Sequence, residues 1–333
     1  MKKYIYIIGS IILIGCAGTN PYLRQAKIYY SQKNFETLKN MCEEWTEKEP
    51  NNPESYLWLG RAYAFLNKFI ESAKNFEKGL NLAKEKTKYL KEFQEIPTAY
   101  YNAGIIYAQH DSIDKAINYL SLSYSLDTTN AQALLNIGSL YQRKNDDENA
   151  KKYITLAYKK GQDIPDILYY YALYIKEENP EECEKVLKKL IEIEKGNARG
   201  YALLGEIYIL KKEYKKASEF YKKAYELDTL NLDNLYNYSF SLLQGGEVKE
   251  AIYHLENLKS KKVEDANVYF LLGTAYEEIN DLKNALNNYE KATILEPERI
   301  DFLKAKAALL IKMGKQSEAY KVLLRIKELE GKK

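Results

Sequence analysis

The sequence predicts an all-α fold, an α-solenoid superhelix of about nine helix-turn-helix repeats. One short phrase returns along the chain, and its small central residue recurs at steps of 34, 34, 33, 34, 34 and 34 from Gly104 onward. A constant period of this size is typical of one supersecondary unit copied along a solenoid. The small centres are Gly60, Gly104, Gly138, Ala172, Gly205, Ser239, Gly273 and Ala307.

Each repeat is predicted to contain two amphipathic helices. A large residue follows most small centres by three positions, and a second small residue comes about nine positions later. Four residues further on stands a bulky side chain, such as Phe76, Leu120 or Tyr221. This i, i+3, i+4 spacing favours helices. Because the polar turn inside most repeats is short, the two helices must be antiparallel neighbours, with small residues packed against large ones where they cross.

These positions resemble the tetratricopeptide repeat family, whose pattern W-x2-L-G-x2-Y, then A-x3-F, then P is followed nearly position by position. The stretch YALLGEIYILKKEYKKASEFYKKAYELD, Tyr201 to Asp228, is a close match. The resemblance reaches back to Asn20, and only the fifth repeat is one residue short, with Pro180 at its turn. We therefore expect one continuous repeat domain at residues 16–333.

Gly60 and Gly104 are 44 residues apart, so the second repeat carries ten extra residues. The segment that carries them, LAKEKTKYLKEFQEIP, has no internal glycine or proline and is rich in Lys, Glu and Leu. We interpret it as an extended second-repeat helix near residues 84–96 that protrudes from the stack. A tolerated insertion and a dedicated docking element are both compatible with this pattern.

Residues 1–15 are predicted to be a lipoprotein signal peptide that is removed. Two lysines precede an apolar run, residues 4–14, which is shorter than the roughly 20 residues that a membrane-spanning helix needs. The sequence Leu-Ile-Gly-Cys that ends at Cys16 resembles the bacterial lipobox. That resemblance implies cleavage before Cys16 and lipidation of its thiol. A secretory signal or a membrane anchor that contains a cysteine by chance is the alternative.

The same resemblance gives an expected location. Two or three acyl chains would hold the protein stably on a lipid bilayer. Ala17, rather than an aspartate, follows the cysteine, which by analogy with enteric lipoproteins favours the outer membrane. We expect a lipid-anchored protein of the bacterial cell envelope that faces the periplasm.

Composition and residue types exclude several classes of function. The formal net charge is +3, and removing Lys2 and Lys3 with the leader reduces it to +1, so no partner among the nucleic acids is expected. The two histidines, His110 and His254, are far apart and have no metal-ligand partner at helical spacing. No nucleophile motif or complete phosphate loop is present. We expect no cofactor, no metal and no catalysis.

The remaining candidate for function is a surface. In the resembled family the first helix of each repeat lines a concave groove, and the side chains one position after the small centre, or three before it, point into the groove. These positions are unusually apolar and aromatic, which marks a site for a partner; three asparagines match the family position that can hold a peptide backbone. Tight winding or an adjacent copy could instead cover the groove. The predicted groove residues are Leu57, Arg61, Tyr101, Asn102, Ile105, Leu135, Asn136, Tyr169, Leu173, Tyr236, Asn237, Phe240 and Phe270.

These observations favour a membrane-tethered protein-binding scaffold of the bacterial envelope. The resemblance suggests assembly of a pilus, secretion or outer-membrane complex, with envelope proteins or peptide segments as partners. An accessory subunit that docks a cell-wall or polysaccharide enzyme is the alternative, and a self-associating spacer is a third. The sequence does not indicate the oligomeric state.

Overall fold

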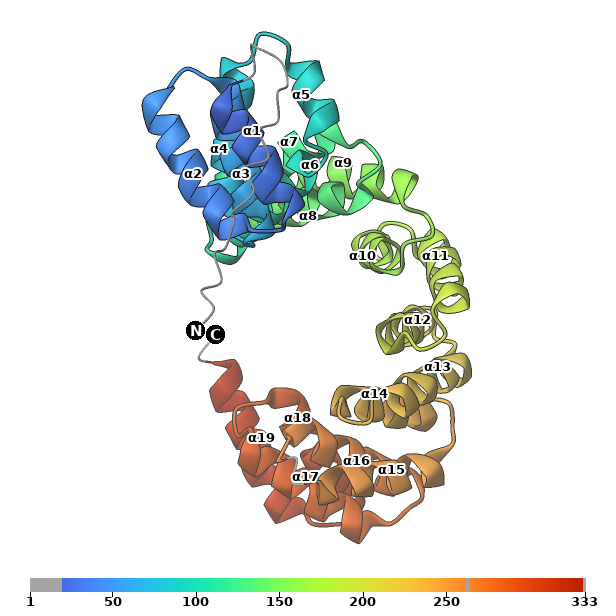
Figure 1. Ribbon diagram of the computed structural model, residues 1–333. Helices are drawn as coiled ribbons and strands as arrows, with labels where there is room; N and C mark the ends of the chain where they lie inside the picture. Colours follow the sequence, from blue (N-terminus) through green and yellow to red (C-terminus); the bar gives the residue numbers. More distant parts are fainter. Residues whose placement is uncertain (1–19, 262–263, 332–333) are drawn as a thin grey trace, which may run out of the picture. The chain divides into compact units, whose positions relative to one another are not determined.

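The computed structural model describes residues 20–261 and 264–331, and within these ranges it contains nineteen helices and no strand (Figure 1). The predicted signal peptide and Cys16 lie outside the described residues. No helix of the described part is long and apolar enough to cross a membrane. The all-α solenoid prediction is confirmed: the helices form nine antiparallel pairs, with one additional short helix after the second pair.

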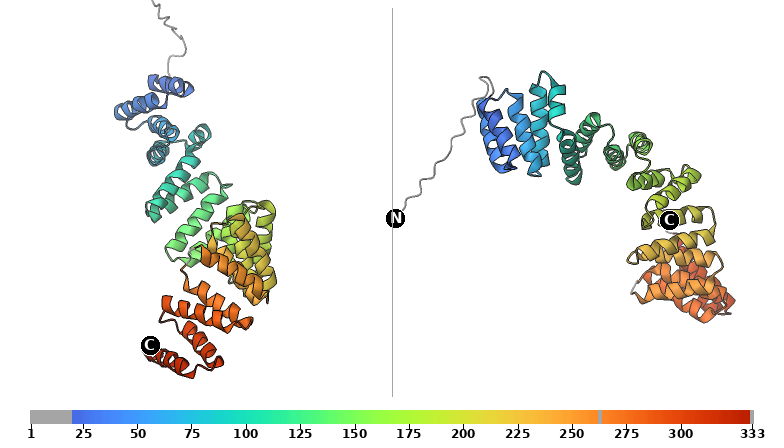
Figure 2. Two further views of the ribbon diagram at one scale, coloured as in Figure 1. Left: turned by 90° about the horizontal axis from the view of Figure 1, so that it is seen from below. Right: turned by 45° about the vertical axis from the view of Figure 1, so that its right-hand side comes forward.

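The chain divides into two compact units, residues 1–160 and 161–333. The continuity of the array across this boundary stays a prediction. Within each unit the pairs follow one another in chain order, as the two views of Figure 2 show.

Four helix pairs and the additional helix make up the first unit. Its helices are α1 (Pro21–Ser31), α2 (Phe35–Lys48), α3 (Pro53–Phe65), α4 (Phe69–Leu82), α5 (Lys86–Glu92), α6 (Ile96–Gln109), α7 (Ile113–Leu126), α8 (Ala131–Arg143) and α9 (Asp147–Lys160).

Five helix pairs make up the second unit. Its helices are α10 (Pro165–Ile175), α11 (Pro180–Ile193), α12 (Ala198–Leu210), α13 (Tyr214–Leu227), α14 (Leu232–Gln244), α15 (Val248–Ser260), α16 (Ala266–Glu278), α17 (Leu282–Leu295), α18 (Ile300–Lys312) and α19 (Gln316–Glu330).

In eight of the nine helix pairs, the turn between the two helices has the same backbone conformation. One residue adopts a positive φ, a conformation that Gly and Asn tolerate best. The fifth repeat instead enters its second helix through Asn179, whose side chain accepts a hydrogen bond from the amide of Glu182, and Pro180 at the first helical position. This different turn explains why that repeat is one residue short. The residues with positive φ are Lys33, Asn67, Asp111, Asn145, Lys212, Gly246, Asn280 and Gly314.

The predicted packing of small against large residues is present at the helix crossings. A Cβ added to Gly205 would lie 2.6 Å from the ring of Tyr221, and one added to Gly273 would lie 2.5 Å from the ring of Tyr289. Contacts this short do not occur between real Cβ atoms and ring carbons, so these crossings require glycine. The bulky side chain four residues after the second small position therefore sets the helix separation.

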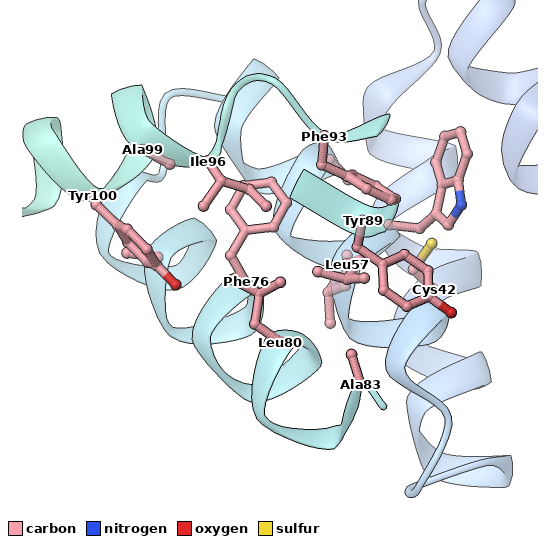
Figure 3. Close-up of a cluster of buried hydrophobic side chains, with 14 of the residues drawn as sticks. Cys42, Leu57, Phe76, Leu80, Ala83, Tyr89, Phe93, Ile96, Ala99 and Tyr100 are labelled. Atoms are coloured by element: carbon pink, nitrogen blue, oxygen red, sulfur yellow. The ribbon is translucent and has the colours of Figure 1, made fainter. Parts of the chain in front are cut away.

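The insertion after the second repeat differs from the prediction. The helix α4 ends at Leu82, and residues 84–96 form the separate short helix α5 followed by a loop, rather than an extension of α4. Tyr89 and Phe93 are buried in the core of the first unit, where Figure 3 shows them near Leu57 and Phe76. The extended, protruding helix near 84–96 is thus corrected to a segment that folds back onto the repeats. The cause is hydrophobic, because these two aromatic side chains would otherwise be exposed to water.

The two described cysteines behave as core residues. Cys42 and Cys183 are fully buried and unpaired, and the Cys183 thiol donates a hydrogen bond to the carbonyl of Ala172 at 3.3 Å. Burial raises the pKa of Cys183 to about 12, so its thiol stays protonated and unreactive at neutral pH.

Candidate functional site

In the second unit, a hollow of about 250 Å³ is lined mainly by the first helices of several repeats. We call it the Asn-lined hollow. Three consecutive repeats contribute to it through α10, α12 and α14, together with the end of α13 and the loop that follows. Its lining residues are Tyr169, Leu173, Ala198, Arg199, Ala202, Leu203, Glu206, Tyr221, Asp228, Asn231, Asn234 and Asn237.

One wall of the hollow is aromatic and apolar. Tyr169 and the exposed Leu173 lie one turn apart on α10. The guanidinium of Arg199, from α12, lies 4.7 Å from the centre of the Tyr169 ring and forms an ion pair with Asp166 at 3.1 Å. This stacking holds the ring against the next repeat. The wall thus presents a positioned aromatic side chain beside an exposed leucine.

The part of the hollow formed by α12 and α13 carries negative charge. Glu206 accepts a hydrogen bond from the Lys176 ammonium at 2.6 Å. The Asp228 carboxylate forms no ion pair within the described residues and accepts only from the amide of Leu230. The phenol of Tyr221 is buried there. Burial, together with the negative charge of Glu206, raises its pKa, so Tyr221 stays neutral.

Three asparagines on one face of α14 complete the hollow. Asn231 caps the helix by accepting a hydrogen bond from the amide of Asp233 at 3.1 Å. Asn234 is only 4% exposed and Asn237 is half-buried, and neither side-chain amide has a hydrogen-bond partner within the described part of the chain. A carboxamide carries two donors and one acceptor with two lone pairs. Solvent reaches both side-chain amides, because Trp58 Nε1 is the one fully buried side-chain polar atom without a hydrogen bond among the described residues. The two amides are therefore free to bind a ligand that offers both donors and acceptors.

The described residues contain no cluster that could hold a metal ion. The hollow presents an apolar wall and, beside it, two side-chain amides at i and i+3 on α14.

The comparisons with known proteins agree with the observed helix pairs. A family model described as tetratricopeptide repeat matches residues 53–86, 97–130 and 131–159. A second model, described as the second ARM domain of tetratricopeptide repeat protein 21, matches residues 173–297. The chain belongs to the tetratricopeptide repeat family. Tetratricopeptide repeats form protein–protein interaction scaffolds and are typically non-catalytic.

The relatives of this tetratricopeptide repeat chain are distant. BBSome complex member BBS4 of Bos taurus is 24% identical over 97% of this chain and 56% of that protein. Anaphase-promoting complex subunit 3 of Schizosaccharomyces pombe is 27% identical over 40% of this chain and 20% of that protein. The chain spans 20 to 56% of the length of the first curated relatives that it matches.

Among solved structures, one titled as the functional characterization of Pseudomonas aeruginosa pilF is similar to this tetratricopeptide repeat chain. The TM-score is 0.55 at 17% identity, over 65% of this chain and 98% of that chain. At this identity the similarity shows the fold alone.

The tetratricopeptide repeats of the second unit bring three of the predicted groove residues into one hollow: Tyr169, Leu173 and Asn237. Tyr236 lines a separate hollow of about 220 Å³ between α14 and α16. Phe240 is half-buried edge-on to Tyr214, and Phe270 stacks on Phe302 of the next repeat with ring centres 4.5 Å apart. These last two side chains contribute to packing between repeats.

The structure corrects the expectation for Leu57, Arg61 and Leu135, which were predicted to face an open groove. Leu57 and Leu135 are 0% and 1% exposed, and Arg61 is 6% exposed. Leu57 packs against Gly79 of its own repeat so closely that a Cβ added to Gly79 would lie 2.7 Å from the Leu57 side chain. Apolar character at these two positions therefore reflects the helix crossing and core, not a partner surface.

Arg61 is covered by the α5 segment. Its guanidinium pairs with the Glu95 carboxylate, donates to the carbonyl of Glu92 at 2.7 Å, and lies over the rings of Phe93 and Trp58. The insertion therefore closes the groove face of α3.

Three of the remaining groove residues of the first unit make contacts within the protein. The Asn136 side chain donates a hydrogen bond to the Tyr101 hydroxyl at 2.9 Å, joining α8 to α6. Tyr101 and Ile105 pack against the cluster formed by α7 and α8, and Asn102 is half-buried. Tyr101 and Asn136 therefore contact each other across adjacent repeats, as the alternative of a self-covered groove supposed for these positions.

Sequence reasoning missed Asn234 and Arg199. A signal for the first was present, because Asn231, Asn234 and Asn237 recur at every third residue and so share one helix face. Arg199 had no local signal, since its role depends on a tyrosine thirty residues earlier.

Proposed function

We propose that this chain is a membrane-tethered protein-binding scaffold of the bacterial envelope, and that the Asn-lined hollow holds an extended segment of a partner protein. The observation that carries the proposal is the pair of unpartnered amides, Asn234 and Asn237, beside the apolar wall of Tyr169 and Leu173. Main-chain groups of an extended peptide would supply the donors and acceptors that these amides lack, and one apolar side chain would bury Leu173.

The tether belongs to the same proposal. Cys16 would carry the acyl chains that hold the scaffold on the lipid bilayer, in the outer membrane and facing the periplasm. Its support is the lipobox resemblance alone. A scaffold fixed to the membrane would concentrate its partner at that surface, because tethering makes a second binding event effectively intramolecular.

The second unit is the part proposed to bind, because its groove face is open where that of the first unit is filled. In the first unit the α5 segment covers Arg61, and Tyr101 is hydrogen-bonded to Asn136. A partner reaching those side chains would first have to break contacts within the protein. In the second unit Asn234 and Asn237 lose no protein partner on binding.

Site-specific photo-crosslinking tests the proposal. A photoreactive amino acid would replace Leu173 in the hollow or, as a control, Tyr253, which is 67% exposed on α15 outside it. We expect a crosslinked partner at position 173 that is absent at position 253. Adding Asn234→Ala and Asn237→Ala to the Leu173 variant should remove the product. Equal crosslinking at both positions, or a product insensitive to the two alanines, would contradict the proposed site.

A further inference from the structure

The last helix, α19, drawn in red in Figure 1, carries an apolar stripe on its outer face. We call Tyr320, Leu323 and Leu324 the α19 stripe. Their exposed fractions are 63%, 45% and 44%. The opposite face of α19 is buried in its own unit through Ala319, Ile326 and Leu329.

Two residues of the α19 stripe correspond to residues of α17 that the next repeat covers. One repeat earlier, 34 residues back, Leu286 and Tyr289 of α17 occupy the positions of Tyr320 and Leu323. They are 7% and 3% exposed, because they pack in one cluster with Leu309 and Leu310 of α18. Two residues of the stripe, Tyr320 and Leu323, thus occupy positions that α18 covers one repeat earlier, whereas Leu324 stands where α17 has Glu290.

From this we propose that a second copy of this chain covers the α19 stripe, with the two α19 helices antiparallel about a two-fold axis between Leu323 and Leu324. The argument is self-complementarity. Such an axis places Leu323 opposite Leu324 of the second copy. It also places Tyr320 opposite Lys327 of the second copy, whose methylene stem can cover the ring while its ammonium stays in water.

Charge at the edge of the stripe supports the same register. Lys321 and Glu328 are seven residues apart and so lie on one edge of the helix. The two-fold axis brings Lys321 within two residues, about 3 Å along the helix, of Glu328 in the second copy. Lys321 forms no ion pair within the described residues, and Glu328 is shared only with Arg325. Two opposite-charge pairs would therefore flank the stripe.

A head-to-tail stack on α1 of another copy fits less well. The exposed side chains of α1 include Arg24, Gln25 and Lys27, with Ile28 as its one exposed large apolar residue. Such a heterologous contact would join copies into a ring or a filament rather than a two-fold dimer. The α19 pair buries three apolar side chains per copy, well short of the roughly 800 Å² per partner of a standard interface, so the dimer should be weak and reversible.

Disulfide trapping in the full chain tests the contact. In the proposed register the two copies of residue 324 face each other within about 2 Å along the helix, so Leu324→Cys should form an intermolecular disulfide under mild oxidation. Tyr253→Cys, equally accessible on α15, should not. The chain without an added cysteine controls for Cys16, since Cys42 and Cys183 are buried.

Charge reversal tests the register in the same trapping assay. Lys321→Glu should lower the disulfide yield of the Leu324→Cys variant several-fold, and adding Glu328→Lys should restore it. Both sites are exposed, so circular dichroism should show an unchanged fold. A Leu324→Cys yield no higher than that of Tyr253→Cys would overturn the dimer. A yield that Lys321→Glu leaves unchanged, or that the double reversal fails to restore, would overturn the antiparallel register.

Discussion

The guanidinium carbon of Arg61 lies 4.0 Å from the centre of the Phe93 ring. This contact joins the first helix of the second repeat to the ten-residue insertion. Phe93 is 1% exposed and also meets the rings of Trp58 and Phe76 edge-on. The insertion is thus part of the core of the first unit.

Phe93→Ala should therefore destabilise the first unit by about 3–5 kcal/mol, because it leaves a cavity among aromatic side chains and uncovers Arg61. Both tryptophans of the chain, Trp45 and Trp58, lie in this unit, so denaturant unfolding followed by tryptophan fluorescence reports on it alone. Ile28→Ala, at a 44% exposed side chain of the same unit, should cost within about 0.5 kcal/mol. Equal effects of the two changes would contradict the packing of the insertion.

The helix crossings allow a second prediction. Gly273→Ala should destabilise the second unit, because the new methyl group would meet the rigid ring of Tyr289 at 2.5 Å. Overpacking costs about 1–3 kcal/mol, only partly offset by the roughly 1 kcal/mol that alanine gains over glycine in a helix. Thermal unfolding followed by circular dichroism would measure it. Gly196→Ala, where nothing lies within 4 Å of the new atom, is the control, and a matching transition temperature for both would show that the crossing is looser than described.

The repeat pattern made these crossings predictable from sequence, since every repeat from the second to the ninth has a small residue at the position of Gly273 and a bulky residue at the position of Tyr289. The α5 insertion was not predictable in the same way, because a Lys- and Glu-rich segment without glycine or proline has high helix propensity. What ends α4 at Leu82 and turns the chain back is the burial of Tyr89 and Phe93, a tertiary effect that local pattern does not contain.

The candidate site was predicted in part. Position within the repeat indicated Tyr169, Leu173 and Asn237, which the structure brings together. The same rule failed for Leu57 and Leu135, because position identifies a helix face but not what covers that face. Leu57, for example, is buried against Gly79 on the second helix of its own repeat, a contact that its position in the first helix does not reveal.

Glu184 supplies a prediction of pH dependence. Burial tends to raise the pKa of this carboxyl, but hydrogen bonds from Lys188, Lys211 and Tyr208 outweigh it and lower the pKa to about 2. The unfolded chain, with a pKa near 4.5, then binds more protons than the folded chain between these values. The stabilisation by Glu184 is therefore fully present above about pH 4.5 and is lost as the pH falls towards 2.

Glu184→Gln should accordingly cost roughly 1–3 kcal/mol at pH 7, and the difference from the wild-type protein should shrink as the pH is lowered through this window. Denaturant unfolding at a series of pH values, followed by circular dichroism, would measure it. Lys185, on the same helix but 76% exposed at its side chain, provides the control Lys185→Gln, with little effect at either pH. A deficit for Glu184→Gln that is independent of pH would contradict this account.

The membrane tether gives a prediction of its own. Cys16→Ser should remove the acylation site, so that cell fractionation finds the protein outside the membrane pellet or retained with an uncleaved leader. Mass spectrometry of the wild-type protein should find acyl chains on Cys16 as the first residue. A serine variant that stays in the membrane as firmly as wild type, with its leader removed, would contradict lipidation at this position.

The central claim is that Asn234 and Asn237 hold the main chain of a partner. Once crosslinking at Leu173 has identified the bound segment, its affinity for the purified protein can be measured by titration calorimetry. We expect Asn234→Ala with Asn237→Ala to weaken binding roughly tenfold or more, since two hydrogen bonds are lost at about 0.5–1.5 kcal/mol each, while Asn75→Ala on an exposed face of α4 leaves it unchanged. An affinity within twofold of wild type for the double variant would contradict the claim.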